Sequence, residues 1–240
     1  MNQEDLKLIC KAIKSGKCLA FLGSGACIAF TNHNKEVVAG LPTGTKLAED
    51  LAGLCDITNG ATNDLSEISE YYLYTCNGDR LELENAIKKF LPQDVLPRPI
   101  HTVLAQLTDI RVVITSNYDT LLEQECAKYN RTLSKHVYNP LNPKTGHFQG
   151  TIFFGDKAAR DVIIHKMHGS IDEQGSMVIT QSYYIRYLAS LNDIDRGMPE
   201  YFRKTIIPQF TLLFLGYSLE DWNFKVIWEG VLSRGRQQIS

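Results

Sequence analysis

Apolar runs and segments with helical spacing alternate along most of the chain. Short runs of apolar residues without polar alternation are typical of strands that are buried on both faces of a parallel sheet. Four such buried strands are predicted, at residues 17–22, 110–115, 162–166 and 210–215. Helix-like segments separate them, and this alternation indicates an α/β fold in which helices flank a parallel sheet.

The helical segments fall into two groups. Outside the middle of the chain we expect helices at 6–14, 120–129, 182–191 and 199–206, and a last apolar helix through 222–231. A short edge strand is predicted near 136–138 and a surface loop at 139–150, where turn-forming residues gather. In the middle, 45–55, 65–76, 80–91 and 98–107 all have helical spacing, with no convincing strand between them. We therefore predict one domain over 1–240 with a helical insertion or layer at 41–108.

Small or polar residues follow each of the four predicted strands. Because the carboxyl ends of parallel strands lie along one edge of a sheet, we expect these residues to converge on a single crevice. The second strand ends in an amide, an acid and hydroxyl groups, which is more hydrogen-bonding capacity than a turn requires, so a ligand is expected there. The clusters are Gly23-Ser24-Gly25, Ser116-Asn117-Tyr118-Asp119, His168-Gly169-Ser170 and Gly216-Tyr217-Ser218.

Composition narrows the classes of partner. The 240 residues are 44% hydrophobic and 22% charged, which is ordinary for a globular protein. A net charge of -2 offers no basic face, so direct nucleic-acid binding is not expected. No apolar run approaches the roughly 20 residues of a membrane span, and the acidic start is unlike a secretory leader. We expect a cytoplasmic protein without membrane association.

The six cysteines do not form a zinc motif. No two of them are two residues apart, as ribbon-type zinc sites require, so no metal is expected. Scattered thiols in a chain of this kind are typically reduced and buried as small apolar groups. They are Cys10, Cys18, Cys27, Cys55, Cys76 and Cys126.

Two of the clusters allow more than one interpretation. The glycines of Gly23-Ser24-Gly25 would let a pyrophosphate approach the backbone, or they only make a tight turn; the third glycine of a dinucleotide fingerprint and the lysine of a P-loop are both absent. His168 suits a general base, although a buried structural histidine is the alternative. Neither a serine-hydrolase elbow nor a metalloprotease helix is present in the sequence.

Taken together in chain order, the clusters resemble the motifs of the sirtuins. They are most similar to the zinc-free sirtuin-like domains of bacterial antiviral defence proteins, such as those of the Thoeris and related systems. Gly40-Leu41-Pro42 also resembles the start of the sirtuin Gly-Ile-Pro-Asp-Phe-Arg segment. The other matches are Gly23-Ser24-Gly25-Ala26-Cys27 with Gly-Ala-Gly-Ile-Ser, Thr115-Ser116-Asn117-Tyr118-Asp119 with Thr-Gln-Asn-Ile-Asp, His168-Gly169 with the catalytic His-Gly, and Gly216-Tyr217-Ser218-Leu219 with Gly-Thr-Ser-Leu.

The resemblance implies that NAD is the substrate, bound at the carboxyl edge of a Rossmann-like sheet. It implies catalytic roles for two residues: Asn117 would bond the nicotinamide ribose and position the attacking water, and His168 would act as the base. Asp119 would meet the nicotinamide carboxamide. The remaining NAD-binding residues would be Gly23, Ser24 and Gly25 at the pyrophosphate, Ser116 beside Asn117, and Gly216 and Ser218 at the adenosine end.

Departures from the sirtuin motifs bear on the reaction. Ser116 replaces the family Gln, Cys27 replaces Ser, and Pro42 is not followed by Asp-Phe-Arg. The four zinc-binding cysteines, which belong to a module that helps hold an acyl-lysine peptide, are missing. Water is therefore the expected acceptor, and the resemblance implies an NAD+ hydrolase that releases ADP-ribose and nicotinamide. The alternatives are an NAD-dependent protein deacylase or ADP-ribosyltransferase, and a module that binds NAD or ADP-ribose without turnover.

The implied biology is NAD depletion in antiphage defence. An NAD hydrolase that was always active would deplete its own cell, so we expect control by homo-oligomer assembly or by a sensor or ATPase partner. The polar residues 233–238 are typical of a domain boundary. The chain is accordingly expected to act as a fragment or subunit of a larger effector.

Overall fold

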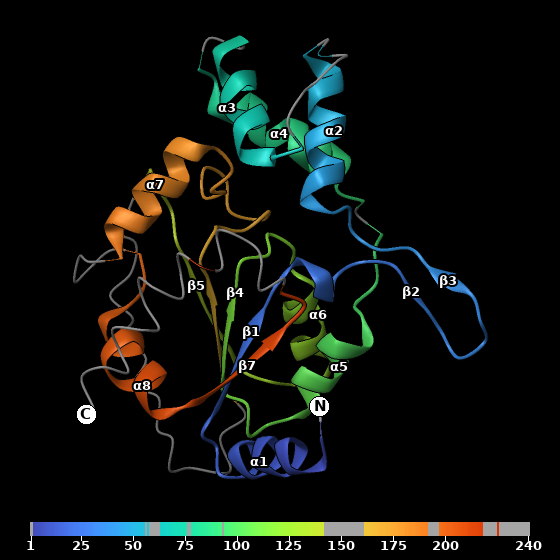
Figure 1. The fold of residues 1–240 in the computed structure, drawn as a ribbon, viewed down its shortest axis with the longest axis vertical. Coiled ribbons are helices and arrows are strands. Elements are labelled where there is room, and N and C mark those ends of the chain that lie inside the picture. The colour runs from blue at the N-terminus through green and yellow to red at the C-terminus, as the bar shows by residue number, and fades with distance from the viewer. Residues whose placement is uncertain are drawn as a thin grey trace.

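The fold is built on one parallel sheet (Figure 1). The computed structural model describes residues 2–55, 57, 63–75, 78–92, 94–141, 161–191, 197–217 and 225. Within these residues the sheet has five strands in the order β5-β6-β4-β1-β7, and every neighbouring pair is parallel. This arrangement confirms the predicted α/β, Rossmann-like class. The strands are β1 (Cys18–Leu22), β4 (Val112–Thr115), β5 (Leu133–Val137), β6 (Val162–Lys166) and β7 (Thr211–Leu215).

The central strands are buried as their sequences predict. All residues of β1, β4 and β6 are buried, because helices cover both faces of the sheet there. The prediction that the strand at 210–215 is buried is wrong, since β7 is half-buried along most of its length. Among the described strands it lies at an edge of the sheet and pairs with β1 alone. The edge strand expected near 136–138 is β5, which begins earlier, at Leu133.

Alternate side chains of the strands enter two separate cores, as the pleat of a strand requires. Leu19 and Phe21 of β1 pack in a cluster with residues of α7 (Gln181–Ser190) and of the segment that follows it. Ala20 and Leu22 pack on the opposite face with residues of two further helices. These are α5 (Pro99–Gln106) and α6 (Leu121–Lys128), with α1 (Gln3–Lys14) nearby at the amino-terminal end of the sheet (Figure 1).

Three helices stand over the carboxyl end of the sheet (Figure 1). We call them the helical layer: α2 (Gly44–Leu54), α3 (Leu65–Thr75) and α4 (Arg80–Phe90). Their apolar faces form a core of their own, which also takes in Met177 and Ile179 from the segment that follows β6. The fourth predicted helix of the middle block is α5, which packs against α6 beside the sheet.

Other predicted elements differ in detail. The helix expected at 199–206 is a π-helical turn, Phe202–Ile206, followed by the short α8 (Ile207–Gln209). A small hairpin of β2 (Phe30–Thr31) and β3 (Val37–Val38) was not predicted, since each strand has only two residues. Most of the predicted loop at 139–150 and the final helix through 222–231 lie outside the described residues, apart from isolated positions. None of the described helices is both long and apolar enough to cross a membrane.

Candidate active site

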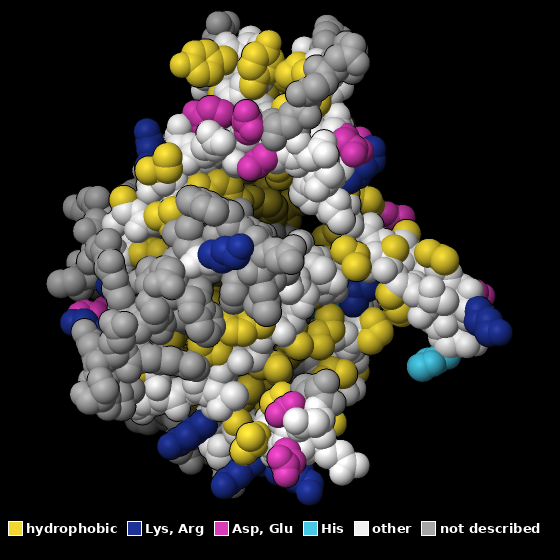
Figure 2. All heavy atoms as spheres, in the orientation of Figure 1, with side chains coloured by type: hydrophobic (Ala, Val, Ile, Leu, Met, Phe, Trp, Pro, Cys, Tyr) yellow, Lys and Arg dark blue, Asp and Glu magenta, His cyan; other side chains and the backbone are white. Residues whose placement is uncertain are grey.

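The carboxyl ends of four strands open into one cavity below the helical layer. Its volume is about 550 Å³, within the range of small-molecule and cofactor sites. Figure 2 shows the face hollowed between the helical layer and the sheet. On the sheet side the cavity is lined by Ser24, Cys27, Ser116, Asn117, Tyr118, Asp119, His168 and Tyr217, and on the other side by residues that include Leu41, Thr45, Leu47, Asp64, Ser66 and Leu91.

The predicted crevice therefore gathers most of the predicted site residues. Ser24, Ser116, Asn117, Asp119 and His168 all line it. The glycines at the ends of β1 and β7 lie next to the lining without forming part of it. Ser218, expected at the adenosine end, lies outside the described residues.

The glycines at the ends of β1 and β7 are required by a close contact between two turns. Gly25 N donates to the carbonyl oxygen of Gly216 at 2.9 Å. A Cβ atom on Gly23 or Gly25 would lie 2.6 or 2.8 Å from that same oxygen, which is too close for any side chain. Gly216 itself has a φ of 71°, which favours glycine. The tight-turn interpretation thus accounts for these glycines, and pyrophosphate binding by them stays a prediction.

Asn117 has a fixed orientation. Its backbone N–H donates to Thr115 Oγ1 at 3.0 Å, and its side-chain Nδ2 donates to Gly23 O at 3.0 Å and to Cys27 Sγ at 3.2 Å. Because a carbonyl oxygen can only accept, Nδ2 must face Gly23. Oδ1 is buried and has no hydrogen-bond partner within the described parts of the chain. Asn117 therefore lines the cavity and carries a buried acceptor for which the described residues supply no donor.

Cys27 lies at the centre of a hydrogen-bonded group. Its thiol donates to Asp119 Oδ2 at 3.2 Å, and its sulfur lies 3.8 Å from His101 Nε2. The backbone N–H of Arg98 donates to His101 Nδ1 at 2.9 Å, so a neutral His101 ring carries its proton on Nε2, facing the sulfur. Burial and the neighbouring Asp119 raise the pKa of the Cys27 thiol, which keeps it protonated. Cys27 is thus unsuited to act as a thiolate nucleophile.

Cys27, His101 and Asp119 also meet the distance requirement for a cation site. Their ligand atoms lie within 4.8 Å of one another. A metal ion, however, needs a lone pair on His101 Nε2 and a thiolate at Cys27. A metal at this cluster would therefore displace the proton on Nε2 and the proton of the thiol.

His168 faces the cavity from the end of β6. Gly169 has a φ of 86°, and a Cβ atom there would lie 2.2 Å from Ser176 O, so the turn after the histidine requires glycine. The rings of Tyr184 and Tyr187 contact the imidazole edge-on, with centroids at 4.9 and 5.4 Å. Burial lowers the pKa of His168 to about 4. The ring is therefore neutral at pH 7.

Sequence reasoning missed a lysine that shapes the site. Lys166 is fully buried at the end of β6, and its Nζ donates to the carbonyl oxygen of Asp119 and to Glu123 Oε1, the latter at 3.1 Å. It thereby fixes the turn that carries Asp119, whose Oδ1 also accepts from Leu121 N at 3.0 Å. The available signal was a lysine as the last residue of a predicted buried strand, 162–166.

The chain is similar to several known proteins. A family model described as a SIR2-like domain matches residues 111–240. The NAD(+) hydrolase ThsA of Enterococcus faecium is 27% identical over 229 residues, 92% of this chain and 41% of the relative. The NAD(+) hydrolase ThsA of Bacillus cereus (strain MSX-D12) is 24% identical over 205 residues, 85% of this chain and 39% of the relative. Defense-associated sirtuin 2 of Bacillus subtilis is 24% identical over 231 residues, 93% of this chain and 20% of the relative. The chain thus spans less than half the length of these relatives.

Proposed function

The chain belongs to the SIR2-like domain family, and on this premise we propose that it hydrolyses NAD+ to nicotinamide and ADP-ribose. Relatives named as NAD(+) hydrolases support the choice of substrate. The observation that carries the proposal is that Asn117 and His168 line one cavity and that the buried Oδ1 of Asn117 has no partner among the described residues. In the proposed complex, a ribose hydroxyl or the attacking water donates a hydrogen bond to Asn117 Oδ1.

In the proposed reaction the bond between the nicotinamide nitrogen and ribose C1′ breaks and a water oxygen bonds to C1′. The electron pair of the broken bond leaves with nicotinamide, which becomes neutral. The transition state has oxocarbenium character. Asn117 Oδ1 holds the ribose hydroxyl or the water, and neutral His168 accepts the proton that the water loses.

The remaining contacts follow the predicted roles. Asp119 receives the carboxamide N–H of nicotinamide, because each carboxylate oxygen can accept more than one hydrogen bond. Ser24 and Ser116 contact the middle of the dinucleotide along the cavity wall. We assign the adenosine end to Gly216 and, from the sequence alone, to Ser218.

We further propose that the chain is the catalytic part of a larger NAD-depleting effector in antiphage defence. Relatives named as a defence-associated sirtuin and as ThsA support this setting. Control comes from assembly into a homo-oligomer or from a sensor or ATPase partner in the cytoplasm. A concentration series in light scattering, with activity followed in parallel, tests control by assembly: a specific activity that stays constant through oligomerisation contradicts it.

The test of the reaction is to incubate the protein with NAD+, alone and with its genomic neighbours, and to follow nicotinamide and ADP-ribose by chromatography. Equal release of both products without an acceptor supports hydrolysis. Asn117→Ala and His168→Ala should each reduce release at least 100-fold, as expected for groups that position and deprotonate the water. His33→Ala, at an exposed position of the β2–β3 hairpin, is the matched control and should keep full activity.

Other outcomes of the same assay contradict the proposal. Release that requires an acylated peptide identifies a deacylase, and labelling of a protein acceptor identifies an ADP-ribosyltransferase. Binding of NAD+ in calorimetry without release identifies a binding module. If no assembly releases nicotinamide, NAD+ hydrolysis is wrong.

A further inference from the structure

The segment between β6 and α7 forms a compact loop, residues 169–178, directly after His168. Val178 N donates to the carbonyl oxygen of His168 at 2.8 Å, so the end of the loop returns to its start. Inside the loop, the Ser176 hydroxyl accepts from Ser170 N at 2.9 Å and lies 3.0 Å from Ser170 O. The position of the His168 backbone therefore depends on where this loop is held.

Tyr118 holds both ends of the loop from the sheet side. Its hydroxyl donates to Val178 O at 2.6 Å, and its carbonyl oxygen accepts from Ile171 N at 2.8 Å. Burial raises the pKa of Tyr118 to about 12, so the hydroxyl keeps its proton and remains a donor. Tyr118 directly follows Asn117 in the chain, and both line the cavity with His168. The sirtuin motif described above has Ile at this position, which offers no hydroxyl.

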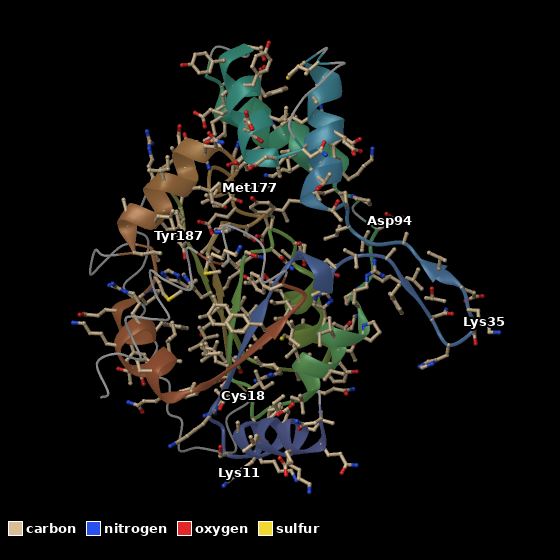
Figure 3. All side chains as sticks on the ribbon, viewed as in Figure 1. Lys11, Cys18, Lys35, Asp94, Met177 and Tyr187 are labelled. Carbon is tan, nitrogen blue, oxygen red and sulfur yellow. The ribbon has the colours of Figure 1, made fainter. Side chains whose placement is uncertain are left out.

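The helical layer holds the same loop from the other side. Glu84 of α4 accepts from Gly175 N at 2.8 Å and from Met177 N at 3.3 Å, and it pairs with Arg80 at 3.1 Å. Arg80 Nη2 donates in turn to Gly175 O at 3.0 Å. Figure 3 shows Met177 between the helical layer and the sheet. The contacts with α4 hold the middle of the loop. Its ends are held to the sheet by the hydrogen bonds of Tyr118.

We propose that Tyr118 is a positioning residue for His168: its hydroxyl fixes the loop that sets the imidazole in register with Asn117 across the cavity. The two groups follow different strands, β4 and β6, and the reaction proposed above requires both at one water molecule. Tyr118 bonds to the backbone of the His168 loop and adjoins Asn117. The inference rests on the proposed function for its catalytic consequence, although the effect on the His168 ring can be measured without catalysis.

The catalytic test compares Tyr118→Phe with the wild-type protein in steady-state nicotinamide release. Loss of the hydroxyl should lower kcat about tenfold while KM stays within about twofold, because small misplacement of a reacting group slows chemistry more than it weakens binding. Tyr74→Phe is the matched control, since Tyr74 is 84% exposed on α3. A kcat of Tyr118→Phe within twofold of wild type overturns the inference. If the Phe variant does not fold, Tyr118→Met removes the same hydroxyl, keeps an apolar side chain and is judged by the same criterion.

A second measurement observes His168 directly. Its ring signals in NMR spectra are identified by their loss in His168→Ala and followed through a pH titration. Among the described residues, the titratable groups that interact with the ring are Tyr184 and Tyr187 of α7 and His165 of the preceding strand β6. Tyr118→Phe should shift the His168 signals and raise their titration midpoint, because a loosened loop admits water, whereas Tyr74→Phe should not. Unchanged signals overturn the inference. If wild type releases no nicotinamide, the proposed function fails, and this titration still decides the role of Tyr118.

Discussion

The hydroxyl of Tyr217 donates to Ser116 Oγ at 3.1 Å and joins the turn after β7 to the turn after β4. The Tyr217 ring also packs on Gly23, because a Cβ atom there would lie 2.9 Å from Tyr217 Cδ2. Both residues depart from the sirtuin motifs, which have Gln and Thr at these positions. Their contact explains why serine replaces glutamine at position 116, because a short side chain there leaves room for the ring of Tyr217.

Tyr217→Phe should raise the KM for NAD+ and leave kcat unchanged. Without the hydroxyl the ring is no longer held to Ser116 at the cavity wall, so the binding surface is less well ordered. The expected rise in KM is roughly two- to tenfold, since a neutral hydrogen bond contributes about 0.5–1.5 kcal/mol. Steady-state kinetics measure it, with Tyr71→Phe as the control because Tyr71 is 50% exposed on α3. An unchanged KM would show that the bridge does not shape the substrate site.

The value of kcat/KM for nicotinamide release should stay constant from neutral pH down to well below pH 6.5. Because burial lowers the pKa of His168 to about 4, the ring is neutral above that value, and kcat/KM should fall only as the pH approaches 4. An unburied histidine would cause the fall near pH 6.5. A profile of kcat/KM between pH 4 and 8 distinguishes the two. A loss of activity centred near pH 6.5 contradicts the assignment of a buried His168 as the base.

The same shift predicts a stability change with pH. The folded-state pKa of His168 lies below the unfolded value, so the unfolded chain binds more protons between about pH 4 and 6.5 and stability decreases as the pH falls through that window. His165, whose pKa burial also lowers, contributes in the same direction. His168→Asn should therefore reduce the slope of unfolding free energy against pH without abolishing it. Urea unfolding at several pH values measures that slope, and equal slopes would contradict a buried neutral His168.

Glu84→Gln should destabilise the fold strongly. Glu84 is 1% exposed and pairs with Arg80, so the substitution leaves a buried guanidinium without its counter-charge. Removing one partner of a buried ion pair costs about 3–5 kcal/mol. Urea unfolding measures the loss, with Glu82→Gln at an exposed position of the same helix as the control. Equal stability of the two variants would show that the contact between α4 and the His168 loop contributes little.

Individual strands and site residues could be predicted from the sequence more reliably than the contacts between distant segments. β1 and β4 were predicted because no charged residue interrupts their apolar sequences. Asn117 and His168 were predicted because the polar clusters that contain them exceed what a turn requires and resemble the sirtuin motifs. The exposure of β7 depends on strand order, which no local pattern encodes. Gly23 and Gly25 suggested a phosphate site, whereas the close contact that explains them is with Gly216, about 190 residues away. The bonds from Tyr118 and Glu84 to the His168 loop likewise join distant segments. Local pattern cannot distinguish such side chains from ordinary helix or turn residues.

Cys27→Ser and Cys27→Ala should differ in activity. A serine hydroxyl can still donate to Asp119 and accept from Asn117, so Cys27→Ser should keep kcat/KM within about threefold of wild type. Alanine removes both contacts and leaves Asn117 Nδ2 with Gly23 O alone, so kcat/KM should fall by about tenfold or more, at the scale of two lost hydrogen bonds. Steady-state nicotinamide release measures both variants, and Cys10→Ala, at an exposed position of α1, is the control. Equal losses in the serine and alanine variants would show that the thiol itself takes part in the reaction. A loss of wild-type activity in a chelator would instead favour a metal at Cys27, His101 and Asp119.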